Sequence, residues 1–181
     1  MKESLMKYAL LPALTYLLVG CASDIAVKLS PPQPTQLTQG ALLAAVTVND
    51  LRKPGIAASK REAAFGVPMG NITFDPPEVQ LVKETLEIEL TKLLQERGIP
   101  SKQIYVCDVL EFGVNTNTTA LYWDVIGRVR LVLKHNGREY NLAGTHTERT
   151  YIWPGEALVK KVVEESLRQV VEGLKPAVQA G

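Results

Sequence analysis

The Asn136-Gly137 dipeptide constrains the fold of this 181-residue chain more than any other local feature. A type I′ turn needs positive φ at both central residues, and Asn-Gly tolerates this best. Apolar and polar residues alternate before the dipeptide, as in a strand with one buried and one wet face. The apolar set is Leu121, Trp123, Val125, Val129, Leu131 and Leu133, and the polar set is Asp124, Arg128, Arg130 and Lys134. With residues 139–153 as the return strand, the sequence predicts a long β-hairpin.

Two segments have the apolar periodicity of amphipathic helices. The first begins at Pro76-Pro77 and ends near Arg97-Gly98, a basic last turn before a C-cap glycine. Its apolar face is Val79, Val82, Leu86, Leu90, Leu93 and Leu94. The second follows Pro154-Gly155, and its face is Val159, Val162, Val163, Leu167, Val170, Val171 and Leu174.

The remaining segments complete a prediction of fold class. Residues 24–29 could form an edge strand, 41–48 form a buried strand, and 104–112 form another. Residues 51–71 lack a sustained period and are interpreted as a long loop, and 113–119 as a polar turn. We therefore expect residues 41–181 to be a single α+β domain. The predicted architecture is a two-layer sandwich, an antiparallel sheet with two amphipathic helices packed on one face.

The amino terminus has the layout of an export signal. Lys2 and Lys7 precede thirteen largely apolar residues, 8–20, and Cys21 follows them. At a rise of about 1.5 Å per residue this segment is about 20 Å long, which is short of the roughly 30 Å hydrocarbon core of a bilayer.

Leu18-Val19-Gly20-Cys21, followed by Ala22-Ser23, resembles the bacterial lipobox. The resemblance implies that residues 1–20 are a lipoprotein signal peptide and that Cys21 becomes the lipidated first residue of the mature chain. Multiple acylation gives stable anchoring without a spanning helix. Ala22 in place of Asp implies the outer membrane rather than retention at the inner membrane. A cleaved secretory signal with an incidental cysteine is the alternative.

Residues 21–40 are interpreted as the lipidated N-terminus and a Pro/Gln-rich spacer, or else an ordinary surface loop. Removing residues 1–20 takes away Lys2, Lys7 and Glu3, which leaves 18 basic and 18 acidic residues. This balance gives no indication of nucleic-acid binding. Cys107 would then have no intramolecular disulfide partner, and we interpret it as a buried core residue.

Five further residues are candidates for binding. Asp50 and Arg52 follow the buried strand 41–48 and could order the next loop through an ion pair. Arg128 and Arg130, with Tyr122 at the same parity, could grip an acidic partner or a glycan from the exposed sheet face, although a solvated face explains them as well. Trp153 could form a binding rim, or it could simply pack in the fold.

The sequence offers little support for an enzyme. There is no nucleophile elbow and no phosphate-binding loop. His146 and Glu148 would share a sheet face and could form an acid/base pair, or else a solvated polar pair. His135 and His146 lack the spacing of a zinc site. We therefore expect no enzymatic activity, no metal and no cofactor apart from the covalent lipid on Cys21.

The segment Val46-Thr47-Val48-Asn49-Asp50-Leu51-Arg52, with the later helix and the β-rich second half behind a lipobox, resembles the YajG-like family of bacterial lipoproteins. The resemblance implies an outer-membrane lipoprotein of α+β fold, and it supplies no catalytic residues. We expect a lipid-anchored, periplasm-facing protein that binds or scaffolds an envelope protein. The alternative is an auxiliary lipoprotein of a lipid-transport ABC system that binds an apolar ligand.

Overall fold

The computed structural model describes residues 23–31, 42–53, 59–63 and 66–179. These residues form one seven-stranded sheet together with helices. The strands are β1 (Ile25–Lys28), β2 (Ala44–Asp50), β3 (Ser59–Glu62), β4 (Pro68–Asp75), β5 (Gln103–Thr118), β6 (Trp123–His135) and β7 (Arg138–Thr150), and the helices are α2 (Glu78–Glu96), α3 (Glu156–Glu172) and α4 (Lys175–Gln179). The fold class is α+β, as the sequence predicts. No helix among the described residues is long and apolar enough to cross a membrane.

The sheet is mixed, so the prediction of an antiparallel sheet is wrong. The strands follow the order β1-β4-β3-β5-β6-β7, and β2 also pairs with β5. Three pairs are parallel, β1 with β4, β2 with β5 and β3 with β5, whereas β5, β6 and β7 form an antiparallel meander. Parallel pairs need crossover connections. The connection between β2 and β5 contains β3, β4 and α2. Periodicity alone does not reveal that strands so far apart in the chain pair with each other.

Strand β5 is the central strand of the sheet and pairs with other strands along both of its edges. One edge pairs with β6 along almost the whole strand. The other edge pairs with β2 from Gln103 to Val109 and with β3 at Asn115. Between these two partners the strand has a bulge, at Val109 to Glu111. The sheet therefore forks on this edge of β5, where β2 leaves and β3 begins.

The interpretation of residues 51–71 as a long loop is wrong, because this range contains all of β3 and the first half of β4. Residues 54–58 and 64–65 of it lie outside the described part. In β3 the inward-facing side chains are Ser59 and Arg61, both buried. Polar residues on the buried face invert the usual alternation. In β4 the buried pair Ile72 and Phe74 follows Gly70 and the polar Asn71, so the apolar pattern of this strand is short.

The predicted polar turn at residues 113–119 is also wrong, because β5 continues to Thr118. Val114 is buried there. The hydroxyls of Thr116 and Thr118 donate to the backbone carbonyl of Glu62 in β3. These threonines therefore link β5 to β3 through hydrogen bonds.

The predicted hairpin is confirmed. Asn136 and Gly137 have φ of 49° and 75°, and β6 pairs with β7 in unbroken register from Trp123 to His135. The alternation holds from Val125 to Leu133, all of whose core-parity members are buried. Leu121 is the exception, because it lies in the turn before β6 and is 77% exposed.

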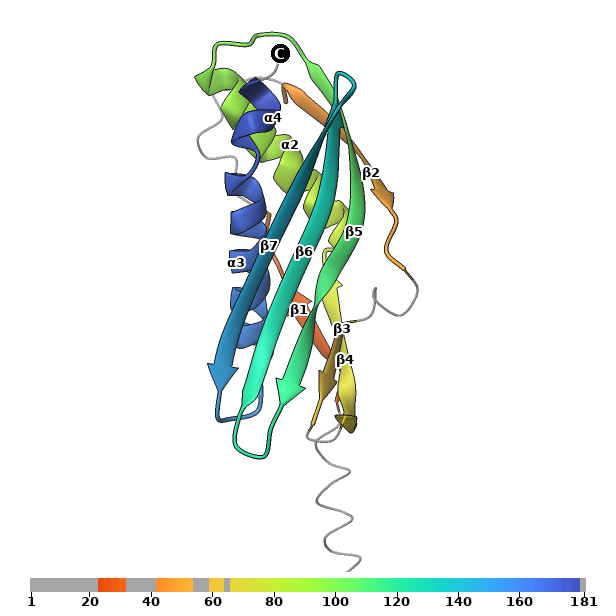
Figure 1. Ribbon diagram of the computed structural model, residues 1–181, viewed down its shortest axis with the longest axis vertical. Helices are drawn as coiled ribbons and strands as arrows, with labels where there is room; N and C mark the ends of the chain where they lie inside the picture. Colours follow the sequence, from red (N-terminus) through yellow and green to blue (C-terminus); the bar gives the residue numbers. More distant parts are fainter. Residues whose placement is uncertain (1–22, 32–41, 54–58, 64–65, 180–181) are drawn as a thin grey trace, which may run out of the picture.

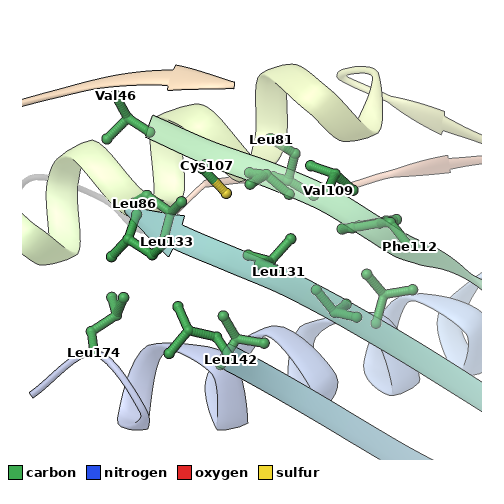
Figure 2. Close-up of a cluster of buried hydrophobic side chains, with 14 of the residues drawn as sticks. Val46, Leu81, Leu86, Cys107, Val109, Phe112, Leu131, Leu133, Leu142 and Leu174 are labelled. Carbon is green, nitrogen blue, oxygen red and sulfur yellow. The ribbon is translucent and has the colours of Figure 1, made fainter. Parts of the chain in front are cut away.

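The helices pack on the face of the sheet that carries the buried side chains (Figures 1 and 2). Helix α2 covers β2, and α3 covers β6 and β7. Figure 2 shows Leu81 and Leu86 of α2 near Cys107, with Leu131 and Leu133 of β6 beside them. Leu81 is buried although the predicted helix face omits it, whereas Val79 is only half-buried. Cys107 is fully buried, as expected of a core cysteine.

The first described strand, β1, is part of the sheet and lies at one of its edges. β1 pairs with β4, and Val27 is fully buried. The Lys28 amide donates to Glu156 Oε1 at the start of α3. The sheet therefore includes residues N-terminal to the predicted spacer, of which residues 32–41 lie outside the described part.

Two glycines let α3 approach the hairpin closely. A Cβ built on Gly144 in β7 would lie 1.9 Å from the backbone oxygen of Ser166, and one on Gly127 in β6 would lie 2.9 Å from the backbone oxygen of Val162. Backbone contact of this kind leaves no room for a side chain, so both positions require glycine.

Gly144→Ala should destabilise the fold by about 3 kcal/mol, because the new methyl overlaps helix backbone that can move only by shifting α3. Urea unfolding of the full chain measures this as a lower midpoint. Gly155→Ser is the matched control, because nothing lies within 4 Å of that Cβ and serine is favoured at a helix N-cap. Equal midpoints for the two variants would contradict the close approach.

Candidate functional site

Asp50 and Arg52 form the predicted ion pair. Arg52 Nε donates to Asp50 Oδ1 and Nη2 to Oδ2, each at 2.8 Å, which makes the contact bidentate. Arg52 Nη1 lies 3.3 Å from Glu78 Oε1 at the first turn of α2 and 3.5 Å from the carbonyl oxygen of Phe112 in β5. The Arg52 side chain is only 8% exposed.

This arginine fills the fork of the sheet. The Leu51 amide still donates to the Val109 carbonyl, and beyond it the Val114 amide donates to Ser59 Oγ at 2.9 Å. Between them Arg52 reaches the Phe112 carbonyl. Side chains thus replace the missing ladder bonds where β5 passes from one partner to the other.

The charges at the fork stabilise each other's ionised forms. Hydrogen bonding to Arg52 lowers the pKa of Asp50 below its ordinary value, and hydrogen bonding to Asp50 raises the pKa of Arg52. Both groups therefore stay charged at neutral pH. The pair orders the end of β2 and joins it to α2 and β5.

Arg128 and Arg130 lie on the outer face of β6, at the predicted parity. Arg130 is 60% exposed on its side chain, and its Nε lies 3.5 Å from Glu111 Oε2. Farther along the same face, Lys134 binds Asp108 at 2.8 Å, and Asp108 also accepts from Asn49 at 2.8 Å. These bonds lower the pKa of Asp108. Arg130 and Lys134 on this face are thus paired with carboxylates.

Trp153 lies at the opposite end of the hairpin from Asn136-Gly137, in an aromatic cluster. Its ring packs edge-on against Trp123 with centroids 5.7 Å apart. The guanidinium of Arg61, from β3, lies 5.4 Å from the Trp153 ring centroid. Tyr122 packs against Tyr151 in the same way, at 6.3 Å. We call Tyr122, Trp123, Tyr151 and Trp153 the aromatic cluster.

Tyr122 belongs to this cluster rather than to a stripe with Arg128 and Arg130. The Arg149 guanidinium stacks on the Tyr122 ring at 3.8 Å and also makes a bidentate contact with Asp124, at 2.8 and 3.1 Å. The predicted basic and aromatic stripe is therefore divided between the sheet face and the end of the hairpin.

Arg61 ties the first described residues to this end of the fold. Its Nη2 donates to the carbonyl oxygen of Ser23, and burial lowers its pKa. Asp24 accepts from the Asn71 amide at 2.7 Å, and a Cβ on Gly70 would lie 2.4 Å from the Ser23 oxygen. Ser23 and Asp24 are thus packed against β3 and β4. Cys21 itself lies outside the described residues.

The two histidines already have hydrogen-bond partners. His146 Nε2 lies 2.9 Å from Glu148 Oε1, and Lys161 of α3 lies 2.7 Å from the same oxygen. These contacts, Lys161 first, lower the pKa of Glu148, which is the reverse of what a general acid needs. His135 Nδ1 lies 3.0 Å from the Ile104 carbonyl, and Nε2 lies 3.1 Å from Asn136 Nδ2. A carbonyl only accepts, so His135 carries its proton on Nδ1.

A cavity of about 290 Å³ lies between α2 and α3, near the end of β1. Its wall is mostly apolar, from Leu29, Leu81, Leu167 and Val171, and the charged residues Glu89, Glu164 and Arg168 also line it. Thr85 lines it too, buried and with a hydroxyl that has no hydrogen-bond partner. The volume is at the lower limit of ordinary small-molecule sites.

The five described candidates thus lie at three places, the fork, the outer face of β6 and the aromatic cluster, rather than in one site. Sequence reasoning missed Arg61 and Thr85, because an arginine in a short polar strand and a threonine within a helix have no distinctive local pattern. Within the described ranges no group of three or more His, Cys, Asp or Glu side chains is placed to hold a metal ion.

Comparisons with known proteins add little. No family model matches the chain, and no curated protein matches it. Among solved structures, the crystal structure of an uncharacterized protein is similar over 76% of this chain and 91% of its own, at 12% identity and a TM-score of 0.41.

Arg52→Ala should destabilise the fold by about 2–3 kcal/mol, because it leaves Asp50, Glu78 and the Phe112 carbonyl without their shared cation. Arg130→Ala removes the same side chain from an exposed site and should change the free energy of unfolding by less than about 0.5 kcal/mol. Urea unfolding at neutral pH measures both. A cost at position 130 as large as that at position 52 would contradict the role given to the fork.

Proposed function

We propose that this chain is a bacterial lipoprotein, lipid-anchored through Cys21 to the outer membrane and facing the periplasm, with a non-enzymatic binding or scaffolding role toward an envelope protein. The observation that carries the proposal is Leu18-Val19-Gly20-Cys21 after a short apolar segment with a basic start. In this proposal the chain is a relative of the YajG-like family, and it needs neither metal nor nucleic acid.

The folded part supports Cys21 as the anchor in two ways. Cys107, the other cysteine, is fully buried, and burial raises the pKa of its thiol to about 12, so it is a poor acceptor of any acyl or diacylglyceryl group. The described part of the fold also begins two residues after Cys21, because Arg61 donates a hydrogen bond to the Ser23 carbonyl. Two residues of extended chain span at most about 7 Å. The anchor would thus hold the domain close to the bilayer surface.

The binding surface in this proposal is the outer face of the sheet. We propose that the sheet and its helices form the two layers of a sandwich, with the helices on the inner face. The outer face then presents Arg128 and Arg130, candidates for contact with an acidic partner. Glu148, the carboxylate of the candidate acid/base pair, is held in its ionised form by the ion pair with Lys161, which favours a non-enzymatic role.

Cys21→Ala should abolish lipidation, because alanine has no sulfur to receive the lipid. The measurements are intact mass of the purified protein and partitioning into the detergent phase. Cys107→Ala is the matched control and should keep both the lipid mass and the detergent partitioning. Unchanged mass and partitioning in the Cys21 variant would refute the lipoprotein proposal.

The cavity between α2 and α3 favours one second candidate, an auxiliary lipoprotein of a lipid-transport ABC system. Its apolar wall suits an acyl chain, and the free hydroxyl of Thr85 and the nearby Arg168 suit a polar group attached to it.

Native mass spectrometry after gentle extraction separates the two candidates. Lipid transport predicts a stoichiometric, non-covalent lipid that Leu81→Trp, which fills the cavity, displaces. Leu142→Met, a buried substitution outside the cavity lining, is the control and should keep it. A domain without bound lipid favours scaffolding.

A further inference from the structure

One end of this fold carries a group of exposed apolar side chains. Seven large hydrophobic residues are exposed among those the structure describes, and four of them lie in the loops near the aromatic cluster: Val67, Leu121, Tyr151 and Ile152. The last three are 77%, 72% and 76% exposed. We call these four residues the apolar tips.

Three connections bring the tips together. Leu121 lies between β5 and β6, Tyr151 and Ile152 follow β7, and Val67 lies between β3 and β4. The ring contact between Tyr122 and Tyr151 joins the first two connections. Glu62, at the end of β3, is bonded to Thr116 and Thr118 at the end of β5, which brings the third to the same end. In Figure 1 these connections lie together at the lower end of the sheet.

The amino-terminal segment reaches the fold at this same end. Ser23 is bound by Arg61, whose guanidinium also lies over Trp153 in the aromatic cluster. Cys21 is two residues earlier, a distance of at most about 7 Å along extended chain. A lipid on Cys21 would therefore bring the apolar tips, rather than the Asn136-Gly137 turn, to the bilayer.

The chemistry of this end suits a lipid interface. Tyrosine and tryptophan are enriched at the level of lipid headgroups, where one side of the ring is apolar and the other wet. The apolar tips project separately from loops and do not form a groove for a peptide. The cations nearby, Arg61 and Arg149, already bind the Ser23 carbonyl and the Asp124 carboxylate. The proposed contact with the membrane therefore depends on apolar side chains and not on attraction to anionic lipid.

We propose that the apolar tips insert into the headgroup region of the membrane that carries the anchor, and that they fix the orientation of the domain on that membrane. This inference rests on the proposed lipidation of Cys21. The anchor supplies attachment, and the tips supply orientation. The outer face of the sheet then stands at a steep angle to the bilayer, open to a partner from the side.

The native tryptophans report on the proposal, because both of them, Trp123 and Trp153, lie in the aromatic cluster. The lipidated full-length product is reconstituted in phosphatidylcholine vesicles whose acyl chains are brominated near the glycerol end. Bromine quenches only nearby indoles, so we expect strong quenching relative to vesicles without bromine.

The decisive comparison is between two double variants that carry the same charge. Leu121→Asp with Ile152→Asp removes two apolar tips and should reduce quenching about twofold or more, because aspartate is not buried in the interface. Leu42→Asp with Ile104→Asp alters two exposed residues at the other end of β5 and should quench like the wild type. Unfolding midpoints close to that of the wild type show that both variants fold.

The intact mass of the same samples tests the proposed function separately. A lipidated protein with equal quenching in all three forms would overturn the membrane-insertion proposal and leave the lipoprotein proposal standing. A protein without lipid would overturn the lipoprotein proposal; the same three forms are then attached to the vesicles through a maleimide lipid at Cys21, since Cys107 is buried. Reduced quenching in only the first double variant still supports insertion, and equal quenching overturns it.

Discussion

The sheet depends on how β5 satisfies its second edge. One edge is filled by β6, but the other serves β2 and β3 in turn, and neither reaches the middle of the strand. Arg52 and Ser59 provide the bonds that are missing there, to the Phe112 carbonyl and from the Val114 amide. A buried backbone group without a partner costs free energy comparable to a lost hydrogen bond. Two side chains therefore make possible a sheet that forks.

The free edge of β2 is satisfied in a related way. The amides of Ala44 and Val46 donate to Thr91 Oγ1 and Glu87 Oε1 of α2, each at 3.1 Å. An open strand edge invites pairing with another chain, and a helix that covers it removes that hazard. Helix α2 thus has two tasks: it buries an apolar stripe and it caps a strand. Thr91, a polar residue within that stripe, is buried for the second reason.

Sequence patterns predicted the elements whose stability is local. The hairpin, both long helices and the buried Cys107 follow from turn chemistry and apolar period. Sequence patterns failed to predict the elements in which polar side chains form hydrogen bonds with backbone groups far away in the chain. The polar residues Ser59 and Arg61 made β3 unrecognisable as a strand, and Thr116 and Thr118 made the end of β5 resemble a turn. Their hydrogen-bond partners are 38 or more residues away in the chain. Asp50 and Arg52 were identified as a pair, but their link to Glu78 and β5 is tertiary.

The contacts of strand β1 determine when folding of the domain can be completed. It is the first strand that the structure describes, yet its partner in the sheet is β4, and α3 packs against it, with Glu156 accepting a hydrogen bond from the Lys28 amide. Contacts across so many residues form late, because the loop-closure entropy must be overcome first. During synthesis from the amino terminus, β1 with its Val27 side chain would lack the cover of α3 until that helix has been made. Packing of β1 is therefore completed by a helix that is synthesised more than 120 residues after it.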